Sequence, residues 1–140
     1  MSSPVPVAEI VRSGFVEGRH HGSVLALEPD GEVAWSVGDV ASPILPRSCN
    51  KPVQALAMLR HGLDLSGADL ALACASHSGE SFHVEGVRRL LDAAGLDESA
   101  LQCPADYPFD ADVLEAHLRA GGGRQRVLMN CSGKHAAMLL

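Results

Sequence analysis

The stretch Arg47-Ser48-Cys49-Asn50-Lys51-Pro52-Val53-Gln54 places a hydroxyl and an amine three residues apart. Residues three apart lie on the same face of a helix, so Ser48 and Lys51 can meet if a helix begins near Ser48. Pro52 supports this start, because proline is tolerated only in the first turn of a helix. A serine becomes a nucleophile when a neighbouring base takes its proton, and lysine is such a base only when neutral. The spacing therefore predicts a nucleophilic serine at a helix start, where unpaired N–H groups can hold an oxyanion.

Lysine is rare in this chain, which has nine arginines and two lysines, Lys51 and Lys134. Lys134 stands in Cys131-Ser132-Gly133-Lys134, again three residues after a nucleophile-type side chain. Solvated surfaces usually carry many lysines, so the two here indicate defined positions. The simpler alternative is that Ser-x-x-Lys arises by chance, as a surface serine followed by a solvated lysine.

The first third of the sequence is typical of antiparallel β structure. Residues 5–12 resemble an early strand, which Pro6 confines to a sheet edge or a strand start. Residues 23–27 and 32–37 are strand-like and are joined by Pro29-Asp30-Gly31, and Asp-Gly between apolar runs is a strong hairpin signal. We expect the polar stretch 17–22 to form a turn.

The remainder of the sequence favours helices. One is expected to begin close to Ser48 or Cys49 and to end at His61-Gly62. Others are expected at 84–94, at 110–120 with Asp110 as the cap, and from Asn130 onward with Asn130 as the cap. Residues 69–75 fit either a strand or a buried helix. The sequence thus predicts an α+β fold, in which an antiparallel sheet packs with helices.

Composition argues against several classes of partner. The formal net charge is −6 and the sequence has no basic cluster, which disfavours binding to nucleic acid or to an anionic membrane. No apolar run approaches the ~20 residues that a membrane-spanning helix needs. The segment Met1–Pro6 lacks the basic start and apolar stretch of a signal peptide, so a cytoplasmic location is expected.

The last residues, 134–140, form an apolar helical pattern without a stop signal. Natural domains rarely end on such a run. We therefore expect residues 1–140 to be the N-terminal part of a single domain that continues beyond Leu140.

Four stretches of the sequence together resemble one family, the serine-lysine asparaginase II enzymes of bacteria and fungi. The stretches are Glu17-Gly18-Arg19-His20-His21-Gly22, Arg47-Ser48-Cys49-Asn50-Lys51-Pro52-Val53-Gln54-Ala55, Ser76-His77-Ser78-Gly79-Glu80 and Asn130-Cys131-Ser132-Gly133-Lys134-His135. They occur in the family's order and at compatible spacing, although Gly18 stands where the family commonly has serine. The resemblance implies a hydrolase that cleaves the side-chain amide of L-asparagine to L-aspartate and ammonia. It also implies a fold similar to that of serine glutaminases and serine β-lactamases.

The resemblance implies a role for particular residues. Ser48 is the leading nucleophile and Lys51 its proton acceptor, while Arg47 is suited to hold a substrate carboxylate. The family's second active-site serine corresponds to Ser76 or Ser78, and we favour Ser76, which would pair with a lysine beyond Leu140. Ser78 is then expected to contact the substrate.

A metal ion and a dimer are further implications of the resemblance. Cys131 and Lys134 match family zinc ligands that a third, distal cysteine completes, although an amine is an unusual zinc ligand. Amide hydrolysis by a serine requires no cofactor, so zinc would have a structural or substrate-positioning role. The family also implies a homodimer.

Simpler interpretations apply to several of these residues. The four cysteines, Cys49, Cys74, Cys103 and Cys131, are spaced too widely for a disulfide framework, which favours reduced, packed cysteine. A lone histidine is more often structural than functional, which applies to His20, His77, His83 and His135. Three functional alternatives remain: a glutaminase or penicillin-recognising serine acyl enzyme, a non-catalytic zinc-binding module, and an inactive truncated fragment.

Overall fold

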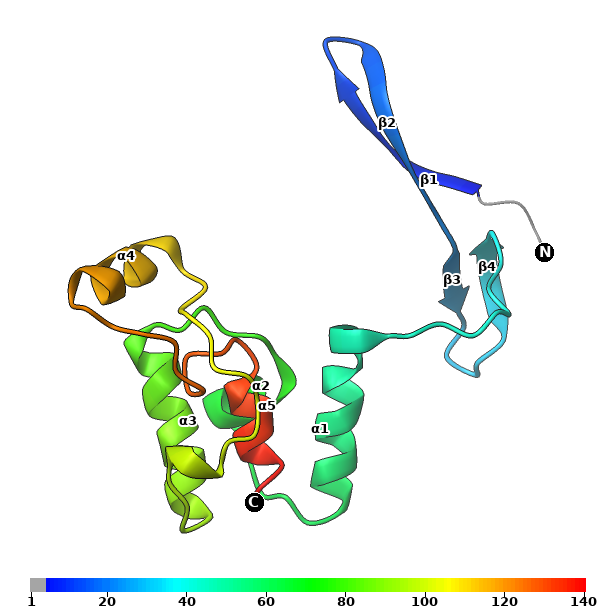
Figure 1. Cartoon of the computed structure of the whole chain (residues 1–140). Coiled ribbons are helices and arrows are strands. Elements are labelled where there is room, and N and C mark those ends of the chain that lie inside the picture. The colour runs from blue at the N-terminus through cyan, green and yellow to red at the C-terminus, as the bar shows by residue number, and fades with distance from the viewer. Residues whose placement is uncertain (1–4) are drawn as a thin grey trace. The chain divides into compact units, whose positions relative to one another are not determined.

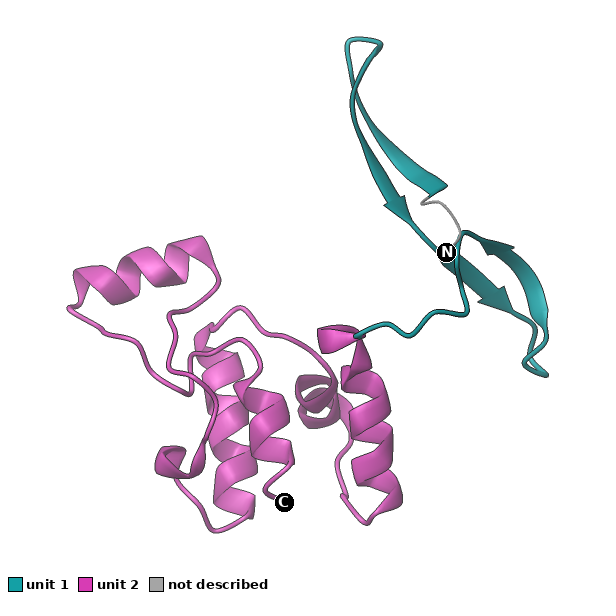
Figure 2. Ribbon diagram, turned by 45° about the vertical axis from the view of Figure 1, so that its right-hand side comes forward, with its two compact units in different colours: residues 1–45 teal, residues 46–140 magenta. Residues whose placement is uncertain are grey.

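The computed structural model describes residues 5–140 and divides into two compact units, one ending at Leu45 and one spanning Pro46–Leu140 (Figure 2). Residues 1–4, part of the segment in which we found no signal peptide, lie outside the described residues. The first unit contains strands and the second contains helices, which confirms the α+β class. The prediction that residues 1–140 belong to a single, longer domain stays a prediction.

The first hairpin of the strand unit consists of β1 (Val5–Arg12) and β2 (Phe15–Gly22), which pair antiparallel. The chain reverses at Ser13 and Gly14, whose φ angles of 49° and 80° place both in the left-handed region. The prediction of a turn at residues 17–22 is therefore wrong. This polar stretch is a strand because its partner supplies the backbone hydrogen bonds and, through Glu9, an ion pair with Arg19 at 2.9 Å.

The second hairpin joins β3 (Val24–Leu27) to β4 (Val33–Val37), as the Pro29-Asp30-Gly31 turn predicts. The Gly31 φ of 93° is one that glycine adopts without strain. Apolar side chains such as Phe15 and Trp35 are more than half exposed in this unit. The hairpins therefore bury little apolar surface of their own, and an isolated two-stranded hairpin is only marginally stable.

The helical unit contains five α-helices and two 3-10 turns within the described residues (Figure 1). They are η1 (Arg47–Asn50), α1 (Lys51–Arg60), α2 (Gly67–Cys74), α3 (Ser81–Ala93), η2 (Glu98–Ala100), α4 (Ala111–Arg119) and α5 (Ser132–Ala137). The apolar segment that fitted either a strand or a helix is α2. Helix α5 packs against both α2 and α3, and α1 packs against α2.

Helix caps confirm one prediction and overturn another. The Asp110 side chain accepts hydrogen bonds of 3.0 Å from the backbone N–H groups of Asp112 and Val113, which caps α4. Asn130 does not cap α5, because that helix begins one residue later than predicted, with Cys131 at the cap position and no side-chain cap bond.

The core of the helical unit is aliphatic, and close approach of α5 to α2 depends on a glycine. Fully buried side chains include Val87, Leu90, Leu101 and Val127. A Cβ added at Gly133 would lie 2.5 Å from Leu72 Cγ and 2.9 Å from the Leu72 carbonyl oxygen. Glycine therefore allows the first turn of α5 to lie against Leu72 of α2.

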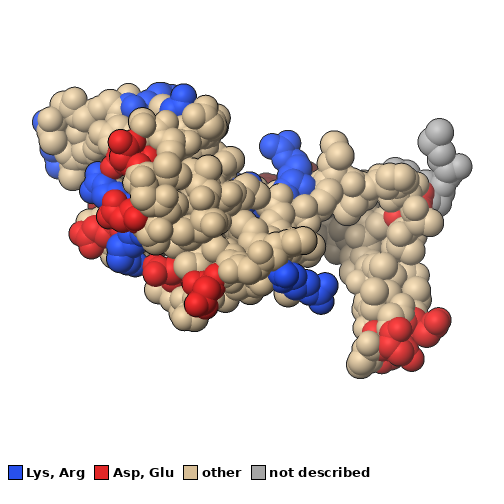
Figure 3. Space-filling model, turned by 90° about the horizontal axis from the view of Figure 1, so that it is seen from below, with Lys and Arg blue, Asp and Glu red and all other residues tan. Residues whose placement is uncertain are grey.

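Positive and negative side chains lie next to one another on the face of the helical unit that Figure 3 shows. Ion pairs there and elsewhere on this unit include Arg88–Glu98 at 2.7 Å and Arg89–Asp69 at 2.8 Å. Among the described residues, no helix is long and apolar enough to cross a membrane.

Candidate active site

Lys51, the first residue of α1, directs a buried amine at Ser76. The residue is only 4% exposed. Its Nζ lies 2.7 Å from the Ser76 hydroxyl oxygen and 3.3 Å from the Ala75 carbonyl oxygen. The predicted site residues Lys51 and Ser76 are therefore in direct contact, and both lie in the helical unit.

Ser48 and Arg47 lie in η1, immediately before α1, and both are exposed. The described hydrogen bonds of Lys51 Nζ go to Ala75 and Ser76, and none joins it to Ser48. Arg47 has a φ of 48°, in the left-handed region that non-glycine residues rarely occupy. Such backbone strain is frequent at functional sites. The pairing of Ser48 with Lys51 stays a prediction, as does the role of Arg47.

The loop from Ala75 to Glu80 carries Ser76 and is fixed at several points. The His77 N–H donates to the Asn130 carbonyl at 2.8 Å, and the Ser78 carbonyl accepts from the N–H groups of Phe109 and Asp110 at 2.8 and 2.9 Å. Gly79 has a φ of 89°, and a Cβ there would lie 2.9 Å from Pro108 Cα. This loop is therefore held against two segments that are distant in sequence, around residues 108–110 and 130–132.

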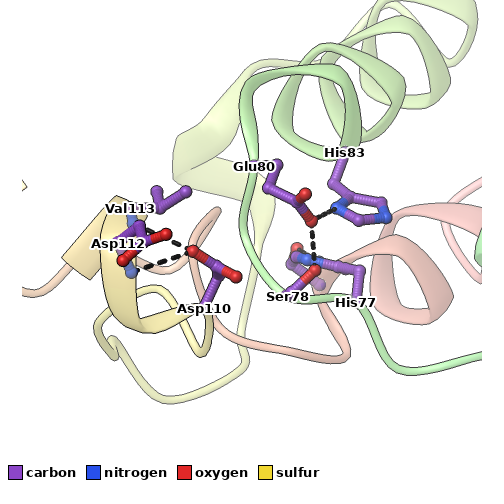
Figure 4. A network of polar contacts seen from close by, with 8 residues as sticks. His77, Ser78, Glu80, His83, Asp110, Asp112 and Val113 are labelled. Atoms are coloured by element: carbon purple, nitrogen blue, oxygen red, sulfur yellow. Dashed lines mark hydrogen bonds and ion pairs between the residues drawn. The ribbon is translucent and has the colours of Figure 1, made fainter.

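The Ser78 side chain points toward Glu80, in a polar group that also includes His83 (Figure 4). Its hydroxyl donates to Glu80, and the same carboxylate oxygen of Glu80 lies 3.3 Å from His83 Nδ1. The serine hydroxyl that contacts Lys51 Nζ is therefore that of Ser76, whereas the Ser78 hydroxyl contacts Glu80. Ser78 remains a predicted substrate contact.

His77 is buried, with 5% of its surface exposed. Its Nε2 lies 2.8 Å from the Ser132 hydroxyl, at the start of α5, and its ring stacks on His83 at a centroid distance of 5.3 Å. Burial lowers the pKa of His77 to about 4, and the neighbouring His83 and Lys51 act in the same direction. His77 is therefore neutral at physiological pH.

A pocket of about 260 Å³ borders the Ser76 loop. Its walls come from α2 and α3, including Ala71 and Gly86, and Ser76, His77 and His83 also line it. The loop that carries the predicted second serine thus forms part of the wall of this pocket.

Cys131 and Lys134 lie one helical turn apart at the start of α5, and both are partly buried. The Cys131 thiol contacts Met129 Sδ at 3.1 Å. Within residues 5–140, no three His, Cys, Asp or Glu side chains form a group that could hold a metal ion. The residues present do not complete a tetrahedral zinc site by themselves. Zinc binding by Cys131 and Lys134 stays a prediction.

Comparison with known families matches the L-asparaginase II family model over residues 8–140. The chain belongs to the L-asparaginase II family. A search of curated proteins gave no match. Family membership indicates hydrolysis of the asparagine side-chain amide, and it confirms the resemblance seen in the four sequence motifs.

Two contacts of this L-asparaginase II chain were not evident from its sequence. Ser132 was part of a family motif, but nothing marked it as the partner of His77, 55 residues away. The contact between Lys51 and Ser76 was also unexpected, because the motif pairs Lys51 with Ser48. Only the rarity of lysine signalled that Lys51 occupies a defined position.

Proposed function

We propose that this chain provides the serine and lysine of an amidohydrolase that converts L-asparagine and water to L-aspartate and ammonia. The observation that carries the proposal is the buried Lys51 amine, 2.7 Å from a serine hydroxyl, in a chain of the L-asparaginase II family. Structural lysines are rarely fully buried without an ionised partner, whereas a buried amine beside a hydroxyl suits proton transfer.

Ser48 is the proposed nucleophile. Lys51 accepts the Ser48 proton, a step in which its amine acts as the base. The Ser48 oxygen bonds to the amide carbon, and the oxyanion that forms requires hydrogen-bond donors close to Ser48. The amide nitrogen leaves as ammonia with the proton from Lys51, and water then hydrolyses the ester to aspartate and free Ser48.

Ser76 holds the lysine in this scheme. Its hydroxyl and the Ala75 carbonyl are the two groups that Lys51 Nζ contacts, so they determine where the amine points. Ser76 can also exchange a proton with Lys51 across the 2.7 Å contact, which makes it a catalytic residue rather than a packing residue. Arg47 is proposed to bind the α-carboxylate of asparagine.

Covalent trapping separates the two serines. The protein is treated with an electrophilic asparagine analogue, and the modified peptide is identified by mass spectrometry. We expect the label on Ser48, loss of label in Ser48→Ala, and slower labelling still at Ser48 in Ser76→Ala. Ser66→Ala is the matched control, because Ser66 directly precedes α2 and its side chain makes no cap bond. A label on Ser76 would reverse the assignment of nucleophile.

Substrate assays test the reaction itself. Ammonia release from L-asparagine supports the proposal, and it should fall by about 10³-fold or more in Ser48→Ala. Release from glutamine alone, or hydrolysis of a β-lactam, would replace asparaginase by the alternative serine acyl enzymes. Near-normal turnover in Ser48→Ala would exclude Ser48 as the nucleophile.

Assembly and location are further parts of the proposal. We expect a homodimer, as the family resemblance implies, and a cytoplasmic location, as the sequence analysis predicts. Sedimentation of the purified protein tests the first expectation, and a monomer at assay concentration would contradict it.

A further inference from the structure

The side chain of His77 links the Ser76 loop to the start of α5. Its ring is buried directly after Ser76, and its Nε2 contacts the Ser132 hydroxyl at 2.8 Å. Ser132 is completely buried and donates its hydroxyl proton to the Val127 carbonyl at 2.8 Å. The contact between His77 and Ser132 therefore connects the Ser76 loop to a fully buried residue of the core.

The geometry determines the tautomer of the ring. A serine hydroxyl has one proton, and a backbone carbonyl only accepts, so the Ser132 proton is committed to Val127. The contact between Ser132 and His77 can then form only if His77 Nε2 carries a proton and donates it. His77 Nδ1 is therefore an unprotonated acceptor.

His77 Nδ1 is buried and has no hydrogen-bond partner among the described residues. Leaving a buried polar atom unpaired destabilises the folded state, because the atom loses its hydrogen bond to water. An apolar side chain of similar size would fill the same space without this cost. Packing alone therefore does not explain why a histidine occupies this position. Its Nε2–H bond to Ser132, in contrast, holds His77, the residue that follows Ser76, in place.

We propose that His77 is a positioning residue, whose Nε2–H bond to Ser132 holds the Ser76 hydroxyl against the Lys51 amine. The main chain contributes through the His77 N–H bond to the Asn130 carbonyl, so both bonds of His77 reach the segment 130–132. A shift of about 1 Å at a reacting group is enough to reduce turnover by about 10²-fold. The expected loss of turnover rests on the proposed function, whereas the expected change in the position of Ser76 does not.

Three variants test the proposal in the full natural chain. His77→Leu and Ser132→Ala remove the bond, and each should lower kcat for asparagine by about 10–10²-fold with KM changed less than about threefold. His77→Gln offers a side-chain amide N–H near the position of Nε2, and it should retain kcat within about threefold of the unmodified chain. His61→Leu at the exposed end of α1 is the matched control and should leave kcat unchanged. Equal losses in the Gln and Leu variants, or no loss in His77→Leu, would overturn the proposal.

Two measurements do not depend on activity. The ring ¹⁵N spectrum of His77 should show a proton on Nε2 and none on Nδ1, and the opposite tautomer would overturn the proposal even if a variant fails to fold. In a crystal structure of His77→Leu, Ser76 Oγ should lie outside the hydrogen-bond range of about 2.7–3.2 Å from Lys51 Nζ. A contact retained in that variant would also overturn it. If the unmodified chain releases no ammonia, the proposed function fails, while these two measurements still decide the role of His77.

Discussion

Lys51 Nζ lies 2.7 Å from Ser76 Oγ, although the two residues are 25 positions apart in the sequence. The contact joins the first residue of α1 to the loop that follows α2, and α1 and α2 pack against one another. The position of the amine is thus a property of helix packing as well as of the Ser-x-x-Lys motif. Substitutions at Lys51 and substitutions in the contacts between the helices should therefore have different effects on activity and on stability.

Replacement of Lys51 by methionine should separate activity from stability. Methionine keeps the length and volume of the side chain but removes the buried amine, so kcat should fall by about 10³-fold or more. The midpoint of thermal unfolding should stay equal or rise, because a polar group no longer loses its hydration on folding. Ammonia release and thermal unfolding measure the two effects. Lys51→Arg should also be inactive, since arginine stays charged, and a catalytically competent Lys51→Met would contradict the role of the amine.

Arg47 should contribute to substrate binding, and its strained backbone should at the same time lower the stability of the fold. The left-handed φ of 48° costs a non-glycine residue about 1–2 kcal/mol, so Arg47→Gly should unfold at a higher temperature than Arg47→Ala. Both variants should raise KM about tenfold or more, because a hydrogen bond to a charged group contributes about 1.5–3 kcal/mol. Comparing glycine with alanine isolates the backbone effect. An unchanged KM in both variants would remove Arg47 from the substrate site.

His77 should make the stability of the fold depend on pH. Its pKa is about 4 in the folded protein, whereas an unfolded histidine titrates near its ordinary value of 6.5. Between these two values the unfolded state binds more protons, so the free energy of unfolding should decrease as pH falls from about 6.5 to about 4. A shift of this size corresponds to about 3–4 kcal/mol at most, and little further change from this residue is expected below pH 4.

Urea denaturation at several pH values measures this dependence. His135 contributes in the same direction, because burial and the neighbouring Lys134 and Lys51 lower its pKa. The difference between the unmodified chain and His77→Gln isolates the contribution of His77. Parallel curves for the two proteins would contradict the neutral, buried state of His77.

Features set by neighbouring residues were predictable from the sequence. The Pro29-Asp30-Gly31 turn, the Asp110 cap and the helix start marked by Pro52 each follow from the backbone preferences of one or two residues. The wrong prediction of a turn occurred where pairing with another segment decides the structure. Residues 17–22 form a strand because β1 is available as a partner, and a polar composition alone gives no sign of that.

The candidate site was predictable as a set of residues, but not as a set of contacts. Short spacing and the rarity of lysine singled out Ser48 and Lys51, and the family resemblance added Ser76. The contact of Lys51 with Ser76 and that of His77 with Ser132 depend on how α1, α2 and α5 pack, which spacing along the chain cannot reveal.

Gly133 should be essential for the helix packing beneath the site. Alanine normally stabilises a helix interior relative to glycine by about 0.5–1 kcal/mol. At this position, however, the new Cβ would lie 2.5 Å from Leu72 Cγ and 2.9 Å from the Leu72 carbonyl oxygen. Overpacking of this kind costs about 1–3 kcal/mol, so Gly133→Ala should lower the free energy of unfolding measured in urea.

Gly123→Ala is the matched control, because no atom lies within 4 Å of the Cβ that it would add and its φ is not positive. It should change stability by less than about 0.5 kcal/mol. Combining Gly133→Ala with Leu72→Ala should cost less than the sum of the two single changes, since the smaller side chain removes part of the collision. Additive effects, or a Gly133→Ala variant as stable as the unmodified chain, would show that α5 does not depend on this close approach to α2.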